Sequence, residues 1–317
     1  MKLFITAKIP KRISEKLKEN FTLIYNDNNE PLTKEDLIKS SKDVDAILCA
    51  LSDKIDKDII NNAKNLKIIA NYGAGYDNID IEAAKRKNII VTNAPAPSSA
   101  VSTAELTFGL ILAVARKIVA GDKFLRSGKF KAWRPTFGLG MELKDKTLGI
   151  IGLGNIGMNL AKRALAFDMK VVYNSRNRKE SFEKEYNIKY LSKDELLKTA
   201  DIISCHTAYV EELHHMIGKK EFEIMKKSAI FINASRGPIV DEEAFAQALI
   251  NKEILAGALD VYEFEPHVNE KLLKLNNLVL TPHLGNATYK ARLEMGENAL
   301  MNLLQFKEGK VCQNKVN

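Results

Sequence analysis

The chain has 317 residues, of which 45% are hydrophobic and 28% charged, and its formal net charge is +8. This composition is ordinary for a globular protein with a full core, and the length favours two domains. The lysines are spread along polar helix faces without a dense basic tract or interleaved aromatic residues. We therefore expect a solvated basic surface and no nucleic-acid partner.

Membrane, disulfide and metal functions are also disfavoured. No apolar run approaches the roughly 20 residues of a membrane span, and residues 1–7 predict a strand rather than a signal sequence. Cys49, Cys205 and Cys312 have neither paired nor metal-type spacing, and the first two lie in apolar runs that predict core positions. We expect no membrane contact and a reducing, cytoplasmic setting.

The first third of the chain alternates predicted strands and helices, which indicates a parallel sheet covered by helices. The predicted strands are 2–7, 21–25, 46–50, 66–71 and 89–92, and the predicted helices include 13–20 and 34–40. One long helix is predicted over 102–128, apolar at first and then polar, as suits a connection or an interface.

A second alternation begins at Thr147. It predicts six strands of a doubly wound dinucleotide domain and a final helix over 287–306. The six strands are 147–151, 170–174, 201–205, 229–233, 254–259 and 278–281.

A glycine fingerprint links the first of these six strands to a helix predicted over 158–167. Gly152 allows a tight turn, Gly154 lets a pyrophosphate approach the main chain, and Gly157 lets the helix pack close to the strand. The start of the helix, with Leu153, Asn155 and Ile156 between the glycines, offers N–H groups and a positive dipole end to phosphates. The pattern predicts a bound dinucleotide.

The end of the next strand bears on which dinucleotide binds. An NAD-binding domain usually has an acid there for the ribose 2′-hydroxyl, but this chain has Ser175, Arg176 and Asn177. Arg176 can fork onto a 2′-phosphate, whereas an acid would repel it. We expect NADP(H), and NAD stays open.

Three ionisable residues follow three strands of this second domain. They are Arg236, Glu265 and His283, and the carboxyl ends of parallel strands are where such folds bind ligands. Hydride reduction of a carbonyl needs an acid that titrates near neutral pH, which suits His283. An arginine suits the carboxylate of a 2-keto acid. No histidine, cysteine or acid cluster has ligand spacing; His214 and His215 are adjacent on an expected helix and should point in different directions.

These motifs resemble the D-isomer-specific 2-hydroxyacid dehydrogenases, and within them the glyoxylate/hydroxypyruvate reductase branch. The resemblance covers nearly the whole chain. It rests on the glycine fingerprint and on the segments 70–80, 103–105, 235–237, 259–266 and 282–288, with 51–56 and 132–135 pointing to the branch.

The resemblance implies a role for each matching position. His283 would give a proton to the keto oxygen, Glu265 would orient His283, and Arg236 would polarise the carbonyl. The remaining residues would contact cofactor or substrate. On the cofactor side they are Thr103, His206, Thr207, Ala234, Ser235, Asp260 and Gly285. On the substrate side they are Leu51, Tyr72, Gly73, Ala74 and Gly75, with Trp133 reaching the active site of the partner subunit.

The resemblance also implies an organisation. A flavodoxin-like substrate domain (1–98 and 284–317) and a Rossmann domain (99–283) would have the active site in the cleft between them, and the nucleotide domains would form a homodimer. The expected reaction is NADPH-preferring reduction of glyoxylate or hydroxypyruvate to glycolate or D-glycerate. D-lactate dehydrogenase, 2-ketogluconate reductase or a dinucleotide-sensing, corepressor-like regulator remain alternatives.

Overall fold

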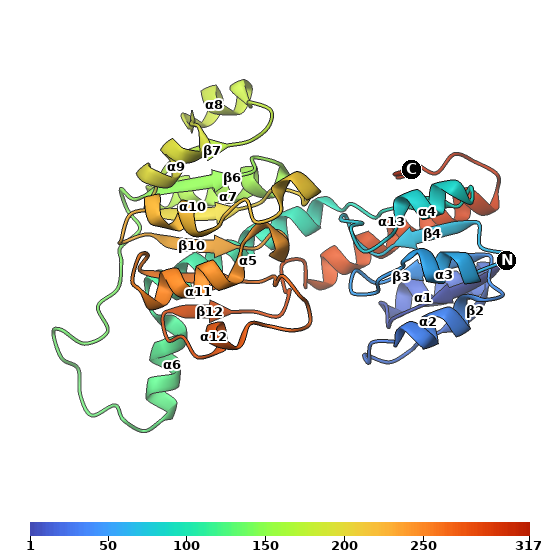
Figure 1. The fold of residues 1–317 in the computed structure, drawn as a ribbon, viewed down its shortest axis with the longest axis horizontal. Helices are drawn as coiled ribbons and strands as arrows, with labels where there is room; N and C mark the ends of the chain where they lie inside the picture. Colours follow the sequence, from blue (N-terminus) through green and yellow to red (C-terminus); the bar gives the residue numbers. More distant parts are fainter. The chain divides into compact units, whose positions relative to one another are not determined.

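Two parallel sheets, each covered by helices, organise the chain (Figure 1), which confirms the predicted α/β class. The computed structural model describes all 317 residues. Unit 1 comprises Met1–Ser99 and Ala287–Asn317, and unit 2 comprises Ala100–Asn286. The first boundary falls inside the helix Pro97–Ala115, and unit 1 is discontinuous because it combines the first and the last part of the sequence.

Unit 1 has a five-stranded parallel sheet in the order β2-β1-β3-β4-β5, the doubly wound order of flavodoxin-like domains. Its strands are β1 (Lys2–Ile5), β2 (Thr22–Tyr25), β3 (Ala46–Cys49), β4 (Ile68–Asn71) and β5 (Ile90–Thr92). Its helices are α1 (Lys11–Asn20), α2 (Lys34–Ser41), α3 (Lys57–Asn62), α4 (Ile81–Arg86) and α13 (Tyr289–Lys307).

Side chains of these strands alternate between two buried layers. Leu3 and Ile5 pack with α1 and α13, whereas Phe4 and Ile47 pack with α3 and α4 on the other face. Burial on both faces explains why the strands read as continuous apolar runs rather than as alternating ones.

Unit 2 has seven parallel strands in the order β12-β11-β10-β9-β6-β7-β8, so the strand order reverses between β6 and β9. The strands are β6 (Thr147–Ile151), β7 (Lys170–Asn174), β8 (Lys189–Tyr190), β9 (Ile202–Cys205), β10 (Ile230–Asn233), β11 (Ala256–Leu259) and β12 (Leu278–Leu280). The helices are α5 (Pro97–Ala115), α6 (Ile118–Arg126), α7 (Asn155–Ala166), α8 (Glu180–Tyr186), α9 (Lys193–Thr199), α10 (Lys219–Ile224), α11 (Glu242–Ile250) and α12 (Glu270–Leu273).

The sequence missed one strand of this sheet. The two residues of β8 pair with β7 at the sheet edge, and both side chains are exposed. So short and exposed a strand has no hydrophobic pattern to reveal it.

The prediction of a single long helix over 102–128 is wrong, because the chain forms the two helices α5 and α6 instead. Lys117 between them adopts a left-handed conformation with φ 54°, which ends the first helix. The carbonyl of Ala115 accepts a hydrogen bond from the N–H of Met141 at 2.8 Å, so a returning segment of chain completes the helix end.

Helix α5 is long and apolar enough by composition to cross a membrane. Its buried residues include Phe108, Ile111 and Val114, which pack against the β6 residues Leu148 and Ile150 in a core of unit 2. The composition of α5 is therefore that of a core helix. The three cysteines are buried free thiols, as predicted for Cys49 and Cys205.

Candidate active site and dinucleotide site

The turn between β6 and α7 has the geometry that the glycine fingerprint predicts. Gly152 has φ 97°, a backbone conformation that residues other than glycine rarely adopt. A Cβ at Gly152 would lie 2.6 Å from the backbone nitrogen of Thr207, and one at Gly157 would overlap the carbonyl oxygen of Gly152. A Cβ at Gly154 would meet no atom within 4 Å, so the main chain there is open to a ligand.

This turn lies where a dinucleotide is expected in such a sheet. The strand order reverses between β6 and β9, and ligands bind outside the carboxyl ends of strands at such a point. Helix α7 begins at Asn155, directly after Gly154, so its N-terminal N–H groups and dipole face the open side of the turn. The residues present fit the pyrophosphate of a nicotinamide dinucleotide.

His206 and Thr207 follow β9 and form the opposite side of the turn. Nε2 of His206 lies 2.8 Å from the Ser204 hydroxyl, while its Nδ1 is buried without a hydrogen-bond partner in the chain. Burial lowers the pKa of His206 to about 3, so the ring is neutral at neutral pH. This nitrogen, beside the glycine turn, therefore lacks the hydrogen-bond partner that buried polar atoms normally have.

The end of β7 is basic, as the sequence predicts. The hydroxyl of Ser175 donates to the carbonyl of Asn177 at 2.7 Å, which closes a small turn there. Arg178 is engaged elsewhere, because its guanidinium forms a two-pronged ion pair with Glu183 at 2.8 Å. Arg176 is exposed and has no ion pair, so it is the arginine of this turn whose charge is uncompensated.

Arg236 follows β10 on a loop held by a residue that the sequence analysis missed. The side chain of Asn233, buried at the strand end, accepts from the N–H and hydroxyl of Ser235 and donates to the carbonyl of Arg236 at 3.0 Å. A strand-end asparagine is a common turn former, which is the signal that could have identified it. Gly237 has no room for a Cβ, which would overlap the backbone of Tyr262, so this loop packs directly on the loop after β11.

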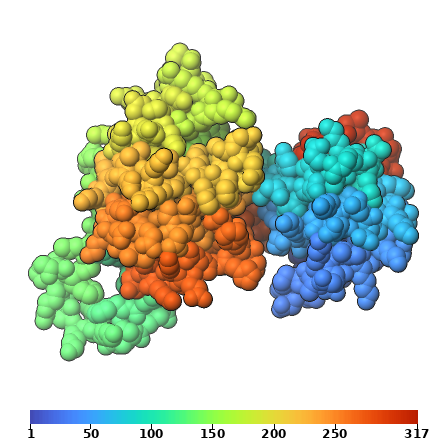
Figure 2. Space-filling model, viewed as in Figure 1, coloured from blue at the N-terminus to red at the C-terminus, as the bar shows by residue number.

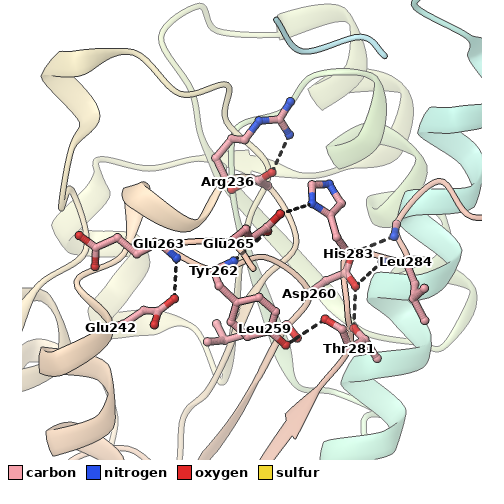
Figure 3. Close-up of polar contacts among 12 residues, drawn as sticks. Arg236, Glu242, Leu259, Asp260, Tyr262, Glu263, Glu265, Thr281, His283 and Leu284 are labelled. Carbon is pink, nitrogen blue, oxygen red and sulfur yellow. Dashed lines mark hydrogen bonds and ion pairs between the residues drawn. The ribbon is translucent and has the colours of Figure 1, made fainter. Parts of the chain in front are cut away.

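Glu265 and His283 form the central pair of the site (Figure 3). Nδ1 of His283 lies 2.9 Å from one carboxylate oxygen of Glu265, and the N–H of Tyr262 donates to the other at 3.0 Å. Burial favours a raised pKa for Glu265, but hydrogen bonds from His283 and Tyr262 and the charges of His283 and Arg236 outweigh it and lower the pKa. The carboxylate therefore holds the Nδ1 edge of the imidazole and leaves Nε2 for a ligand.

Asp260 organises the loop that carries His283 (Figure 3). One of its carboxylate oxygens accepts from the Thr281 hydroxyl and the Leu284 N–H, each at 2.7 Å, and the other accepts from the Gly285 N–H at 2.8 Å. His283 itself has φ 53°, and its N–H donates to the carbonyl of Asp260. These bonds hold a left-handed conformation that is costly for a residue with a Cβ.

The other predicted residues of unit 2 lie at the same carboxyl ends of the strands, with one exception. Ala234 and Ser235 follow β10, and a Cβ at Gly285 would lie 3.2 Å from the Thr103 side chain. Trp133 is 76% exposed, in the segment after α6 that projects from unit 2 away from these strand ends (Figures 1 and 2). The chain alone does not bring Trp133 to Arg236 or His283.

In unit 1, residues 73–75 form a turn after β4 with an unusual hydrogen-bonding pattern. The carbonyls of Gly73, Ala74 and Gly75 accept from Ala94 N–H and the side chains of Asn93 and Asn71, at 2.6–2.8 Å. Their N–H groups donate to no atom of the chain. A turn with its carbonyls tied back and its N–H groups available suits a carboxylate.

His214 and His215 differ from expectation. They lie in a turn after a short 3-10 helix, not on an α-helix, and their rings stack at 4.0 Å rather than pointing apart. The reason is the left-handed conformation of His215, φ 51°, which lets its Nε2 pair with Glu263 at 2.7 Å. The prediction that the two rings point in different directions, and so could not share a metal, is therefore wrong.

Comparison with known proteins gives one consistent family. Residues 108–285 match the D-isomer specific 2-hydroxyacid dehydrogenase NAD binding domain. A protein of Staphylococcus aureus strain MRSA252 that bears the name putative 2-hydroxyacid dehydrogenase is 50% identical over 96% of both chains. A solved structure from Thermus thermophilus covers all of both chains with a TM-score of 0.92 and 38% identity. The NADPH-dependent glyoxylate/hydroxypyruvate reductase of Sinorhizobium meliloti, solved with NADP and malonate, covers 99% of this chain and 96% of its own, with a TM-score of 0.85 and 27% identity.

The lowered pKa of Glu265 predicts a pH-dependent stability. A carboxylate with a depressed folded-state pKa stabilises the protein above its unfolded value of about 4.5, and this contribution is lost as the pH falls through the folded-state value. Glu265→Gln should therefore be less stable than the parent protein at pH 7, and the gap should be smaller at about pH 4, below that unfolded value. Urea unfolding at both pH values measures it, with exposed Glu270→Gln as control. A gap that is the same at both pH values would show that packing, not ionisation, causes it.

Proposed function

Because the chain belongs to the D-isomer specific 2-hydroxyacid dehydrogenase family, we propose that it reduces a small 2-keto acid to the D-2-hydroxy acid with NADPH, glyoxylate and hydroxypyruvate being the expected substrates. The family establishes a nicotinamide cofactor and a dehydrogenase-type reaction. The observation that carries the proposal is the His283–Glu265 pair beside Arg236 at the strand ends of the dinucleotide-binding unit.

The proton chemistry follows from how His283 is held. Its Nδ1–H donates to Glu265, so in the protonated ring Nε2–H is the remaining donor. When bound, the nicotinamide supplies hydride to the carbonyl carbon. As negative charge grows on the keto oxygen, His283 gives that oxygen its Nε2 proton, while Glu265 holds the Nδ1 edge of the ring in place. Glu265 is thus a positioning residue and His283 the acid.

Arg236 would supply positive charge to the substrate. Its guanidinium suits both the growing charge on the keto oxygen and the neighbouring carboxylate. The free N–H groups of Gly73, Ala74 and Gly75 support a role for that turn in holding the carboxylate, as the resemblance implies. The cofactor-contacting role proposed for Asp260 would use lone pairs that its three loop hydrogen bonds leave over.

Removing the proposed acid or the arginine should reduce catalysis without abolishing cofactor binding. His283→Ala should lower kcat/KM by about 10²–10⁴-fold, the usual contribution of a general acid. Arg236→Ala should lower it by about 10²–10³-fold. Initial rates with glyoxylate and hydroxypyruvate, and NADPH titration by fluorescence, measure the two effects. Near-normal turnover by either variant would remove that residue from the mechanism.

We propose a preference for NADPH from the end of β7. Arg176 is exposed and unpaired, and no acid occupies the position that would accept the ribose hydroxyls. The named NADPH-dependent relative supports the same choice.

Replacing Arg176 should remove the preference selectively. A hydrogen bond to a charged group contributes about 1.5–3 kcal/mol, so Arg176→Ala should lower kcat/KM for NADPH by about 10–100-fold and leave NADH within a few-fold. Arg178→Ala is the matched control, because that arginine is paired with Glu183. A parent enzyme that uses NADH better than NADPH would contradict the proposal.

We also propose a homodimer in a cytoplasmic setting. Residues 117–141, here called the arm, expose Ile118, Leu125, Phe137 and Leu139 by 51–64% each, and Trp133 by more. A hollow of about 690 Å³ lies between the arm, the end of α5 and the edge strand β12. Several large exposed apolar side chains on one projecting segment are typical of an interface, and buried free thiols fit a reducing compartment.

Light scattering tests the dimer. The parent protein should have about twice the 35.5 kDa mass of one chain, and Leu125→Glu should shift the equilibrium toward monomer, because a charge would be buried at the interface. Val311→Glu, on the exposed surface of unit 1, is the control. A monomeric parent protein at micromolar concentration would contradict the proposal.

A further inference from the structure

A hollow in unit 1 has a cationic wall that neither the proposed proton chemistry nor the cofactor uses. Its volume is about 550 Å³, and it opens where β1, β3 and β4 end, against the start of α13. We call it the Arg292 pocket and define it by the lining residues Lys8, Leu48, Leu51, Tyr72, Tyr289 and Arg292.

Arg292 is partly buried, and its guanidinium makes no hydrogen bond or ion pair with the chain. Burial lowers the pKa of Arg292 more than its interaction with Tyr72 raises it. Partly buried charges are normally paired, because an unpaired one costs free energy. An unpaired, partly buried arginine at the wall of a pocket is suited to bind an anionic ligand.

The surroundings of Arg292 reinforce the choice of an anion. No acidic residue lines the pocket. Lys8 adds a second cation; its only acidic neighbour, Asp27, is 3.8 Å away and both side chains are exposed, so that pairing is weak. The positive end of the 19-residue helix α13 starts at the same wall.

Tyr72 fixes the arginine in place. The Tyr72 hydroxyl donates to the backbone carbonyl of Arg292 at 2.5 Å, and a Cβ at Gly296 would overlap that hydroxyl, so α13 packs tightly on the tyrosine. The backbone of α13 that carries Arg292 is therefore held by a buried contact.

The pocket adjoins the turn with the free N–H groups. Tyr72 immediately precedes Gly73, and the Leu51 side chain fills the space that a Cβ on Gly73 would occupy. A 2-keto acid whose carboxylate binds to residues 73–75 could therefore extend its side chain past Leu51 and Tyr72 into the pocket. Glyoxylate has no side chain to place there.

We propose that the Arg292 pocket binds a second anionic group, a carboxylate or a phosphate, at the far end of the 2-keto acid substrate. This rests on the proposed reduction of 2-keto acids and narrows the substrate class: the substrate carries an anion at each end. Arg292 is then a specificity-determining residue.

Matched substrate pairs test the proposal in the full-length enzyme with NADPH. The pairs are 2-oxovalerate with 2-oxoglutarate, and hydroxypyruvate with its 3-phosphate; the two pairs separate carboxylate from phosphate. In at least one pair the anionic member should have the higher kcat/KM, by about tenfold or more. Arg292→Gln should reduce that ratio by about 10–100-fold, mainly through KM, and Arg292→Lys should restore part of it. Arg12→Gln, a surface arginine paired with Glu297, should leave the ratio unchanged.

A ratio below one in both pairs, or an equal loss for both members in Arg292→Gln, would overturn the proposal while leaving 2-keto acid reduction intact. If no 2-keto acid is turned over, the shift in Tm caused by succinate and by butyrate tests anion binding in the Arg292 pocket independently of catalysis. Succinate should stabilise the parent protein more than butyrate, and Arg292→Gln should abolish the difference. Equal shifts in the parent protein would refute the pocket.

Discussion

The carboxylate of Asp260 is the interaction on which the site depends. It is 1% exposed and accepts three hydrogen bonds from consecutive parts of the loop after β12. Burial raises its pKa despite those bonds, so the group is enclosed at a cost. In return, its loop holds His283 in a left-handed conformation and sets the position of the imidazole next to Glu265.

Two glutamates near this loop, Glu265 and Glu242, have pKa values that are shifted in opposite directions. Glu265 has a pKa lowered by His283 and Arg236 despite its burial, whereas the pKa of Glu242, which accepts from the Glu263 N–H, is raised by burial. Glu265 therefore stays ionised next to Arg236 and the His283 imidazole, whereas burial favours the protonated form of Glu242. Such divergent neighbouring carboxyl groups are typical of catalytic sites.

Much of this arrangement could be predicted from the sequence because it rests on local signals. The glycine fingerprint and the strand-end positions of Arg236, Glu265 and His283 are readable from residue type and spacing. The break between α5 and α6 at Lys117 could not be predicted, because it depends on the segment around Gly140 and Met141, which returns to the end of α5. The stacking of His214 on His215 and the unpaired charge of Arg292 likewise depend on tertiary neighbours, and no local pattern encodes them.

The place of α13 in unit 1 has a consequence for how the protein is made. Unit 1 starts with the first residue, yet α13 and the segment that pairs Thr92 with Lys315 come from the final stretch, Ala287–Asn317. A ribosome delivers all of unit 2 before it delivers these. Synthesis therefore favours completion of the dinucleotide-binding unit first, with the five-stranded sheet waiting for its helix, the reverse of the usual N-terminal-first order. The hydrogen bond between Tyr72 and Arg292, which are separated by 220 positions, cannot form before this last stretch is made, and it closes a long loop at a corresponding cost in chain entropy.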